Sequence, residues 1–131
     1  MKNIAFILIC FFLLSSCGAK TKHDLIAEAK LHDEYEVNDN YQSIYKRTVD
    51  KLNECTEGLS QYIQRDLYTE LGEGEMFFPG AGGDGYAFLV QIKKTGDNQS
   101  SVKTYSKITS GYYPKFMAIA RMGAYNQSGC P

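Results

Sequence analysis

The chain has 131 residues, with 14 Lys and Arg against 15 Asp and Glu, and its formal net charge is −1. This near-balance argues against a nucleic-acid-binding protein, which usually carries a basic surface. Hydrophobic residues make up 44% of the chain and aromatic residues 13%, enough to build a core, which argues against an acidic disordered chain. The length fits a single domain. The composition therefore indicates a small ordered protein and leaves its chemistry open.

The N-terminus has the pattern of a targeting segment. Lys2 supplies a positive charge, and residues 4–14 form an unbroken apolar run. This run is too short for a hydrocarbon core of about 30 Å, which needs roughly 20 residues, but it fits the apolar region of a secretory signal peptide. Ser15, Ser16 and Cys17 follow directly.

The sequence Leu14-Ser15-Ser16-Cys17 resembles the lipobox of bacterial lipoproteins. The resemblance implies a signal peptide over residues 1–16, cleavage between Ser16 and Cys17, and a diacylglycerol on the Cys17 thiol. Acylation of the new amino group would add a further chain, and several chains together anchor stably where one binds only marginally. Gly18, rather than Asp, comes next, which by the rule of this family implies the periplasmic face of the outer membrane. No cofactor is expected beyond the covalent lipid.

The remaining cysteines predict a disulfide bond. Cys10 lies in the apolar run and Cys17 would carry lipid, which leaves Cys55 and Cys130. Two cysteines in an oxidising envelope have one possible pairing. The closed loop is about 75 residues long, for which the chain-entropy model gives roughly 4–4.5 kcal/mol of stability. Because no CxxC motif is present, we favour a structural bond over a redox or metal role.

Residues 17–38 are predicted to be the lipidated Cys and a flexible tether. The segment is polar and charged, and a flexible chain of this length spans roughly 25 Å. It contains both histidines of the chain, His23 and His32. Residues 39–131 then form a single folded domain.

The domain is expected to begin with a helix over about residues 39–57. Asn38 and Asp39 offer capping oxygens, and Gly58 is a suitable stop. One helical face is formed by Tyr41, Ile44, Tyr45, Thr48, Leu52 and Cys55. For residues 59–72, including Tyr62–Tyr68, a strand and an irregular connection both remain open.

Three strands joined by turns are expected next. Residues 75–78 indicate a short strand, residues 86–92 alternate clearly, and residues 102–108 alternate again. Glycine-rich residues 79–85 and residues 95–98 supply the turns. Consecutive strands with short connections predict an antiparallel meander.

A second helix closes the domain. Ser110 can cap it, and Pro114 suits its first turn. Its apolar face is formed by Phe116, Ile119, Ala120 and Gly123. Two amphipathic helices would cover one face of the sheet, which predicts a two-layer α+β fold in the order helix, antiparallel sheet of three or four strands, helix. The disulfide would join the ends of the two helices.

The chemistry-bearing motifs favour no enzyme. Residues 80–85 match G-x-G-x-x-G, but a strand pattern follows where a dinucleotide site needs a helix, so we interpret them as a hairpin loop. Nucleophilic catalysis needs a base beside the nucleophile, and both histidines fall in the predicted tether. The acidic pairs Glu73/Glu75 and Asp66/Glu70 are ordinary surface features.

No metal site is predicted. The nearest approach to a ligand set is a loose group in the predicted tether, and its spacing matches no closed site. That group consists of His23, His32, Asp33 and Glu34. No catalytic residue is assigned.

A contact surface is the remaining possibility, because the chain has ten Tyr and an unusual glycine-rich loop. Its candidate residues are Gly80, Gly82, Gly83, Asp84, Tyr86, Tyr105, Tyr112 and Tyr113. We therefore expect a membrane-anchored, non-enzymatic binding or scaffold module that faces an envelope protein partner. The alternatives are a small-ligand or cell-wall-binding domain and an inhibitor or immunity-type lipoprotein. No nucleic-acid partner is expected.

Overall fold

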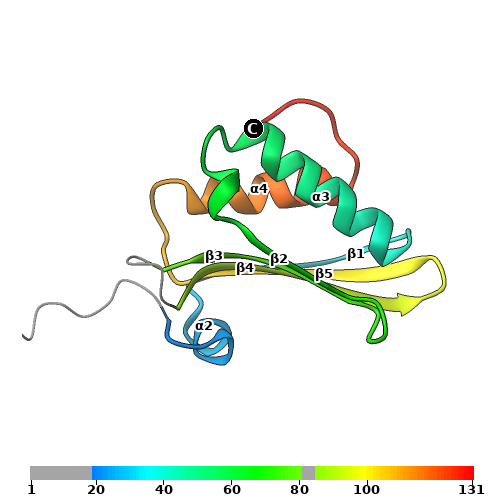
Figure 1. The fold of residues 1–131 in the computed structure, drawn as a ribbon, viewed down its shortest axis with the longest axis horizontal. Helices are drawn as coiled ribbons and strands as arrows, with labels where there is room; N and C mark the ends of the chain where they lie inside the picture. Colours follow the sequence, from blue (N-terminus) through cyan, green and yellow to red (C-terminus); the bar gives the residue numbers. More distant parts are fainter. Residues whose placement is uncertain (1–18, 81–84) are drawn as a thin grey trace, which may run out of the picture.

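A computed structural model describes residues 19–80 and 85–131. Its elements are α2 (Lys22–Glu28), β1 (Leu31–Val37), α3 (Tyr41–Cys55), the short 3-10 helix η1 (Ser60–Tyr62), β2 (Gln64–Tyr68), β3 (Glu73–Pro79), β4 (Tyr86–Gly96), β5 (Gln99–Ser106) and α4 (Tyr113–Ala124). The strands form one antiparallel sheet in the order β1-β5-β4-β3-β2. Helices α3 and α4 cover one face, and α2 lies on the opposite face (Figure 1). The two-layer α+β prediction is confirmed, with five strands in place of three or four.

The main core lies between the sheet and the helix pair α3 and α4. Ile44 and Ile119, one from each helix, are fully buried together with Val90 of the central strand β4. The two helices cross closely at Gly123, where an added Cβ would stand 2.7 Å from the Cα of Thr48. Glycine is therefore required at position 123 by space.

The two predicted helices are confirmed with small shifts at their ends. Helix α3 begins after Asn40, whose side chain accepts a hydrogen bond from the Gln42 backbone N–H. Helix α4 has Pro114 in its first turn, as predicted, but it begins after Tyr112 and Ser110 does not cap it. Its predicted apolar face is buried.

The predicted disulfide joins Cys55 and Cys130, whose Cα atoms are 5.5 Å apart. It connects the last residue of α3 to the tail that follows α4. The far end of the chain is thereby fixed to the helix layer.

The flexible tether is corrected by the structure. Ala19 exchanges two backbone hydrogen bonds with Tyr86, of 3.0 and 2.7 Å. Thr21 and Asp24 form a capping box that starts α2. Strand β1 then pairs with β5 over its whole length. The folded unit thus includes residues 19–38, and the boundary expected at residue 39 does not exist.

The two elements of this segment bury few side chains, which explains why its sequence resembles that of a tether. Helix α2 has seven residues and only Leu25 is buried in it. Strand β1 is an edge strand with a wet outer face, where His32, Glu34 and Glu36 alternate with inward residues. A short element with one solvent-exposed face needs few apolar residues. Its sequence is therefore mostly polar and does not show the pattern of a helix or strand.

The region 59–72, for which both possibilities were open, contains η1 and the edge strand β2. The signal peptide, Ser16, Cys17, Gly82, Gly83 and Asp84 lie outside the described residues.

Candidate functional site

The sheet face opposite α3 and α4 carries a polar network over the half that α2 leaves open. Val90 and Ile92 of β4 point into the main core, so Gln91 and Lys93 between and beyond them point to the other side. Two cross-strand rows run over this face, one of Tyr68, Glu73, Lys93, Ser101 and Glu36, the other of Asp66, Glu75, Gln91, Lys103 and Glu34.

Glu75 is the buried centre of this network, with 6% of its surface exposed. Its carboxylate accepts hydrogen bonds from the Lys22 ammonium of α2 and, at 2.8 Å, from Gln91 Nε2. Burial alone lowers the pKa of Lys22, but the hydrogen bond and charge of Glu75 outweigh it and raise that pKa above its ordinary value. The pair thus holds α2 against the sheet as a charged, hydrogen-bonded contact.

A shallow pocket of about 240 Å³ lies beside Glu75 on this face. The lysines that line it are paired, Lys93 with Glu73 at 2.9 Å and Lys103 with Glu34 at 2.9 Å. A ligand there would have to displace these ion pairs. The pocket lining also includes the hydroxyl side chains of Ser101 and Tyr105, and it includes no histidine or cysteine.

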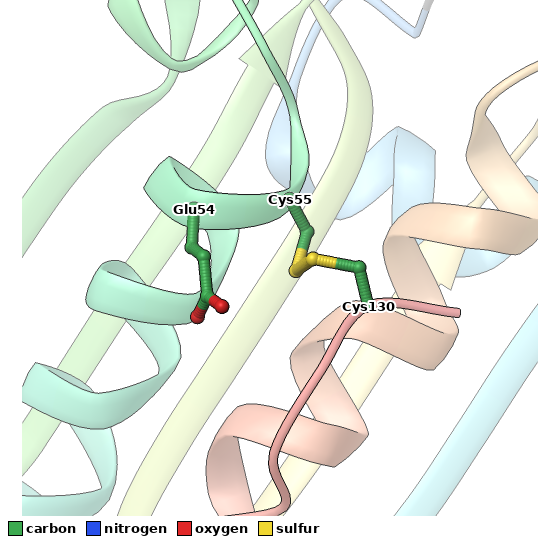
Figure 2. A group of neighbouring side chains, drawn as sticks. All are labelled: Glu54, Cys55 and Cys130. Carbon is green, nitrogen blue, oxygen red and sulfur yellow. A yellow bond between two sulfur atoms is a disulfide. The ribbon is translucent and has the colours of Figure 1, made fainter.

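A second cluster surrounds the disulfide. Figure 2 shows Glu54 beside the bonded sulfurs of Cys55 and Cys130, at the end of α3. These are the one group of metal-ligating side chains in residues 19–80 and 85–131 whose ligand atoms lie within 4.8 Å of one another. Both thiols are consumed by the disulfide and Glu54 pairs with Lys51 at 2.7 Å. In this state the cluster is a covalent staple.

Among the residues that the structure describes, the predicted contact tyrosines do not come together. Tyr86 and Tyr105 pack with Leu25 on the α2 side of the sheet. Tyr112 and Tyr113 surround Phe116 on the other side, with ring centroids 6.2 and 5.8 Å from it.

Other predicted site residues have structural positions. Gly80 follows β3 and donates its N–H to the Gly85 carbonyl. His32, expected in a tether, stacks on Tyr105 with ring centroids 4.8 Å apart. The described tyrosines of the candidate surface are therefore split between two faces of the sheet.

The edge strand β2 is the most open apolar feature of the described residues. Every residue of β2 is exposed, and its outer side has no strand partner in the sheet. Seven large hydrophobic residues are exposed in the described ranges, and four of them lie on β2 or next to it. These four are Tyr62, Leu67, Tyr68 and Leu71, which together we call the β2 edge surface.

The opposite edge of the sheet has a different character. Strand β1 carries Asp33, Glu34 and Glu36, and Asp33 accepts a hydrogen bond of 2.7 Å from Arg121. Charged residues on an edge strand discourage pairing with another chain. On β2, by contrast, Arg65 is hydrogen-bonded to Asn53 and Ser60, and one carboxylate, Asp66, accompanies the exposed apolar side chains.

Sequence reasoning missed the β2 edge surface, because alternating residues such as Leu67 and Tyr68 look like a half-buried strand. The signal that could have revealed it is the shortness of the segment, since natural proteins often place very short strands at the edge of a sheet.

No protein-family model matches the sequence, and no curated protein matches it either. Among solved structures, the fold is similar to a norcoclaurine synthase from Thalictrum flavum, in complex with dopamine and hydroxybenzaldehyde. The identity is 15%, the TM-score is 0.33, and the match covers 76% of this chain and 88% of that one. A likeness of this size carries no argument about activity. Within the described residues, no helix has the length and apolar character needed to cross a membrane.

Proposed function

We propose that this chain is a lipid-anchored, non-enzymatic binding module of the bacterial envelope, which docks an extended segment of a partner protein along β2. The observation that carries the docking is the β2 edge surface, because an edge strand with free backbone groups and apolar side chains can take one more strand. The lipid anchor rests on the lipobox resemblance at Cys17.

The charged network on the open sheet face supports a binding module over an enzyme. Its lysines and glutamates are paired with one another, as Lys93 is with Glu73. Paired charges stabilise a surface, whereas catalysis needs a group poised to exchange a proton or attack a substrate.

Crosslinking from defined positions tests the docking in cells. A photoreactive amino acid at Gln64 or Asp66 of β2 is expected to give one dominant adduct with an envelope protein. The same amino acid at Glu34 or Glu36 of β1 is the matched control on the other edge, and it should give none. Equal adducts from both edges, or none from β2 in correctly folded protein, would contradict the proposal.

Substitution of the exposed apolar residues gives a second arm. Leu71, 67% exposed, and Tyr62, 52% exposed, can be changed to Glu with little effect on the core. We expect the double variant Tyr62→Glu, Leu71→Glu to lose the β2 adduct. Ile26→Glu, an exposed apolar residue of α2, serves as the control and should keep it.

A further inference from the structure

Three lysines of the described residues differ from the others because they form no ion pair. Seven of the ten lysines in residues 19–80 and 85–131 lie within ion-pair distance of a carboxylate. The exceptions are Lys20, Lys30 and Lys115, and all three are exposed. Their charges are therefore free to meet an external partner.

The three free lysines lie at one end of the molecule. Lys20 follows Ala19, which is bonded to Tyr86 at the start of β4. The backbone N–H of Lys30 donates to Ser106, the last residue of β5, and Lys115 is in the first turn of α4. Figure 1 shows the start of β4, the end of β5 and the start of α4 at the same end of the sheet. We call this the lysine end.

The acidic groups near the lysine end offset part of these charges. Glu28 is paired with Lys107. Asp24 is held in the capping box of α2 by backbone contacts, and Glu57 lines a pocket together with Lys115. The three free lysines thus face two carboxylates that no lysine or arginine of the described residues pairs with, and the balance of these groups stays positive.

An exposed aromatic residue accompanies the charges. Tyr112 precedes α4 and is 63% exposed, and its ring stacks against Phe116 at a centroid distance of 6.2 Å. Tyrosine beside lysine is the combination that membrane–water interfaces favour, since the ring and the ammonium both suit the headgroup layer.

Sequence connectivity brings the lysine end to the membrane. Cys17 is two positions before Ala19, and two extended residues reach at most about 7 Å. We propose that the lysine end is a membrane-facing surface that binds anionic phospholipid headgroups through Lys20, Lys30 and Lys115. This inference rests on the lipid anchor of the proposed function, because the anchor is what holds this end at the bilayer.

The strength of such a contact depends on lipid charge and on salt. A lysine near an anionic leaflet strengthens association about fivefold. Salt screens the attraction over roughly 8–10 Å near physiological ionic strength. The contact should therefore appear on anionic vesicles and fade at high salt, while the lipid anchor itself stays inserted.

Lysine footprinting on the full lipidated chain tests the surface directly. The protein is placed in vesicles of phosphatidylethanolamine and phosphatidylglycerol, or of phosphatidylcholine alone, and acetylated with a water-soluble reagent. Mass spectrometry then gives the labelling rate of each lysine. We expect Lys20, Lys30 and Lys115 to be labelled several-fold more slowly on the anionic vesicles, with high salt restoring the rate. Lys46 and Lys94 should not change.

Each other outcome overturns a distinct part of the proposal. Equal protection on both vesicle types would mean that the short anchor, and not headgroup charge, makes the contact. Full labelling on both would overturn the orientation. If Cys17 carries no lipid, the anchor of the proposed function fails. The same footprinting of the unlipidated chain with anionic vesicles then shows whether the three lysines bind headgroups.

Matched variants separate position from total charge. The triple change Lys20→Gln, Lys30→Gln, Lys115→Gln removes the free lysines. The control Lys46→Gln, Lys93→Gln, Lys94→Gln removes as many charges elsewhere. Hydrogen exchange of residues 107–113 is the readout. We expect anionic vesicles to slow this exchange in the wild type and the control, and not in the first variant. Equal slowing in both variants would contradict the proposal.

Discussion

Single residues decide how closely the layers of this fold approach. Arg47 links two connections at once, because it pairs with Asp39 before α3 and donates to the Ala124 carbonyl at the end of α4. Gly123 lets the same two helices touch. Arg47 acts through its charge and Gly123 through its lack of a side chain, and both affect the contact between α3 and α4.

The Asp39–Arg47 pair predicts a pH-dependent contribution to stability. The hydrogen bond from Arg47, and then that from the Asn40 N–H, lower the pKa of Asp39 in the folded state. A lowered carboxyl pKa stabilises the fold above the unfolded value of about 3.9, and the contribution is lost as the pH falls through the folded value. We expect Asp39→Asn to cost less than about 1 kcal/mol near neutral pH, because the pair is partly exposed. Urea unfolding should show the two proteins converging at low pH; a constant gap would contradict this.

The helix crossing predicts a steric effect at Gly123. Because an added Cβ would stand 2.7 Å from Thr48 Cα, Gly123→Ala must push the helices apart. We expect a loss of about 1–3 kcal/mol in the free energy of unfolding, in the range of overpacked cores. Helix propensity alone would favour alanine over glycine by about 1 kcal/mol, so a net loss must come from the contact with Thr48. Urea denaturation followed by circular dichroism measures the change, and a Gly123→Ala variant as stable as the wild type would contradict the close approach.

At the scale of elements, the sequence predicted the long helices and strands with a periodic apolar pattern and missed the short ones. Helix α3 could be predicted because Ile44, Thr48 and Leu52 recur at helical spacing on one buried face. Strand β4 could be predicted because it is central and long. Strand β1 and helix α2 could not, since half of β1 is wet and α2 buries one side chain, Leu25. The separation of the predicted contact residues could not be predicted either. Alternation shows which residues share one side of a strand, but it does not show which face of the sheet that side forms.

Helix α2 provides a test of whether the N-terminal segment belongs to the fold. Leu25 is fully buried against Leu89 and Tyr105. We expect Leu25→Ala to lower the free energy of unfolding by about 2–5 kcal/mol and to speed proteolysis before β1. Ile26→Ala, at the exposed neighbouring position, should change little. If both variants unfold and digest like the wild type, the segment is a tether after all.

The disulfide provides a second test at this scale. It closes a loop with a sequence separation of 75 residues. The chain-entropy model gives about 4 kcal/mol for such a loop. We expect the double variant Cys55→Ser, Cys130→Ser to lose up to that amount in urea unfolding without reductant. Adding a reducing agent should bring the wild type to the same stability and leave the variant unchanged. A variant as stable as the oxidised protein would contradict the staple.

At the scale of the whole molecule, the two proposed surfaces are compatible. The lysine end lies where β4 begins and β5 ends, whereas the β2 edge surface runs along one side of the sheet and reaches the β2–β3 turn at Leu71. In Figure 1 that turn lies at the other end of the sheet from the start of β4. A domain seated on its lysine end would stand with its strands leading away from the membrane, and β2 would remain open to an envelope partner.

This arrangement predicts a dependence on the length of the connection between Cys17 and Ala19. A glycine- and serine-rich insert of about 20 residues after Gly18 would let the domain move roughly 25 Å from its anchor. Because the insert lies before Ala19, the fold should keep its stability in urea. The lipid would still hold the chain, but the local concentration of headgroups at Lys20, Lys30 and Lys115 would fall. We therefore expect their protection from acetylation on anionic vesicles to weaken several-fold, while crosslinking from β2 to the envelope partner persists. Unchanged protection would mean that the lysines hold the bilayer without the short connection.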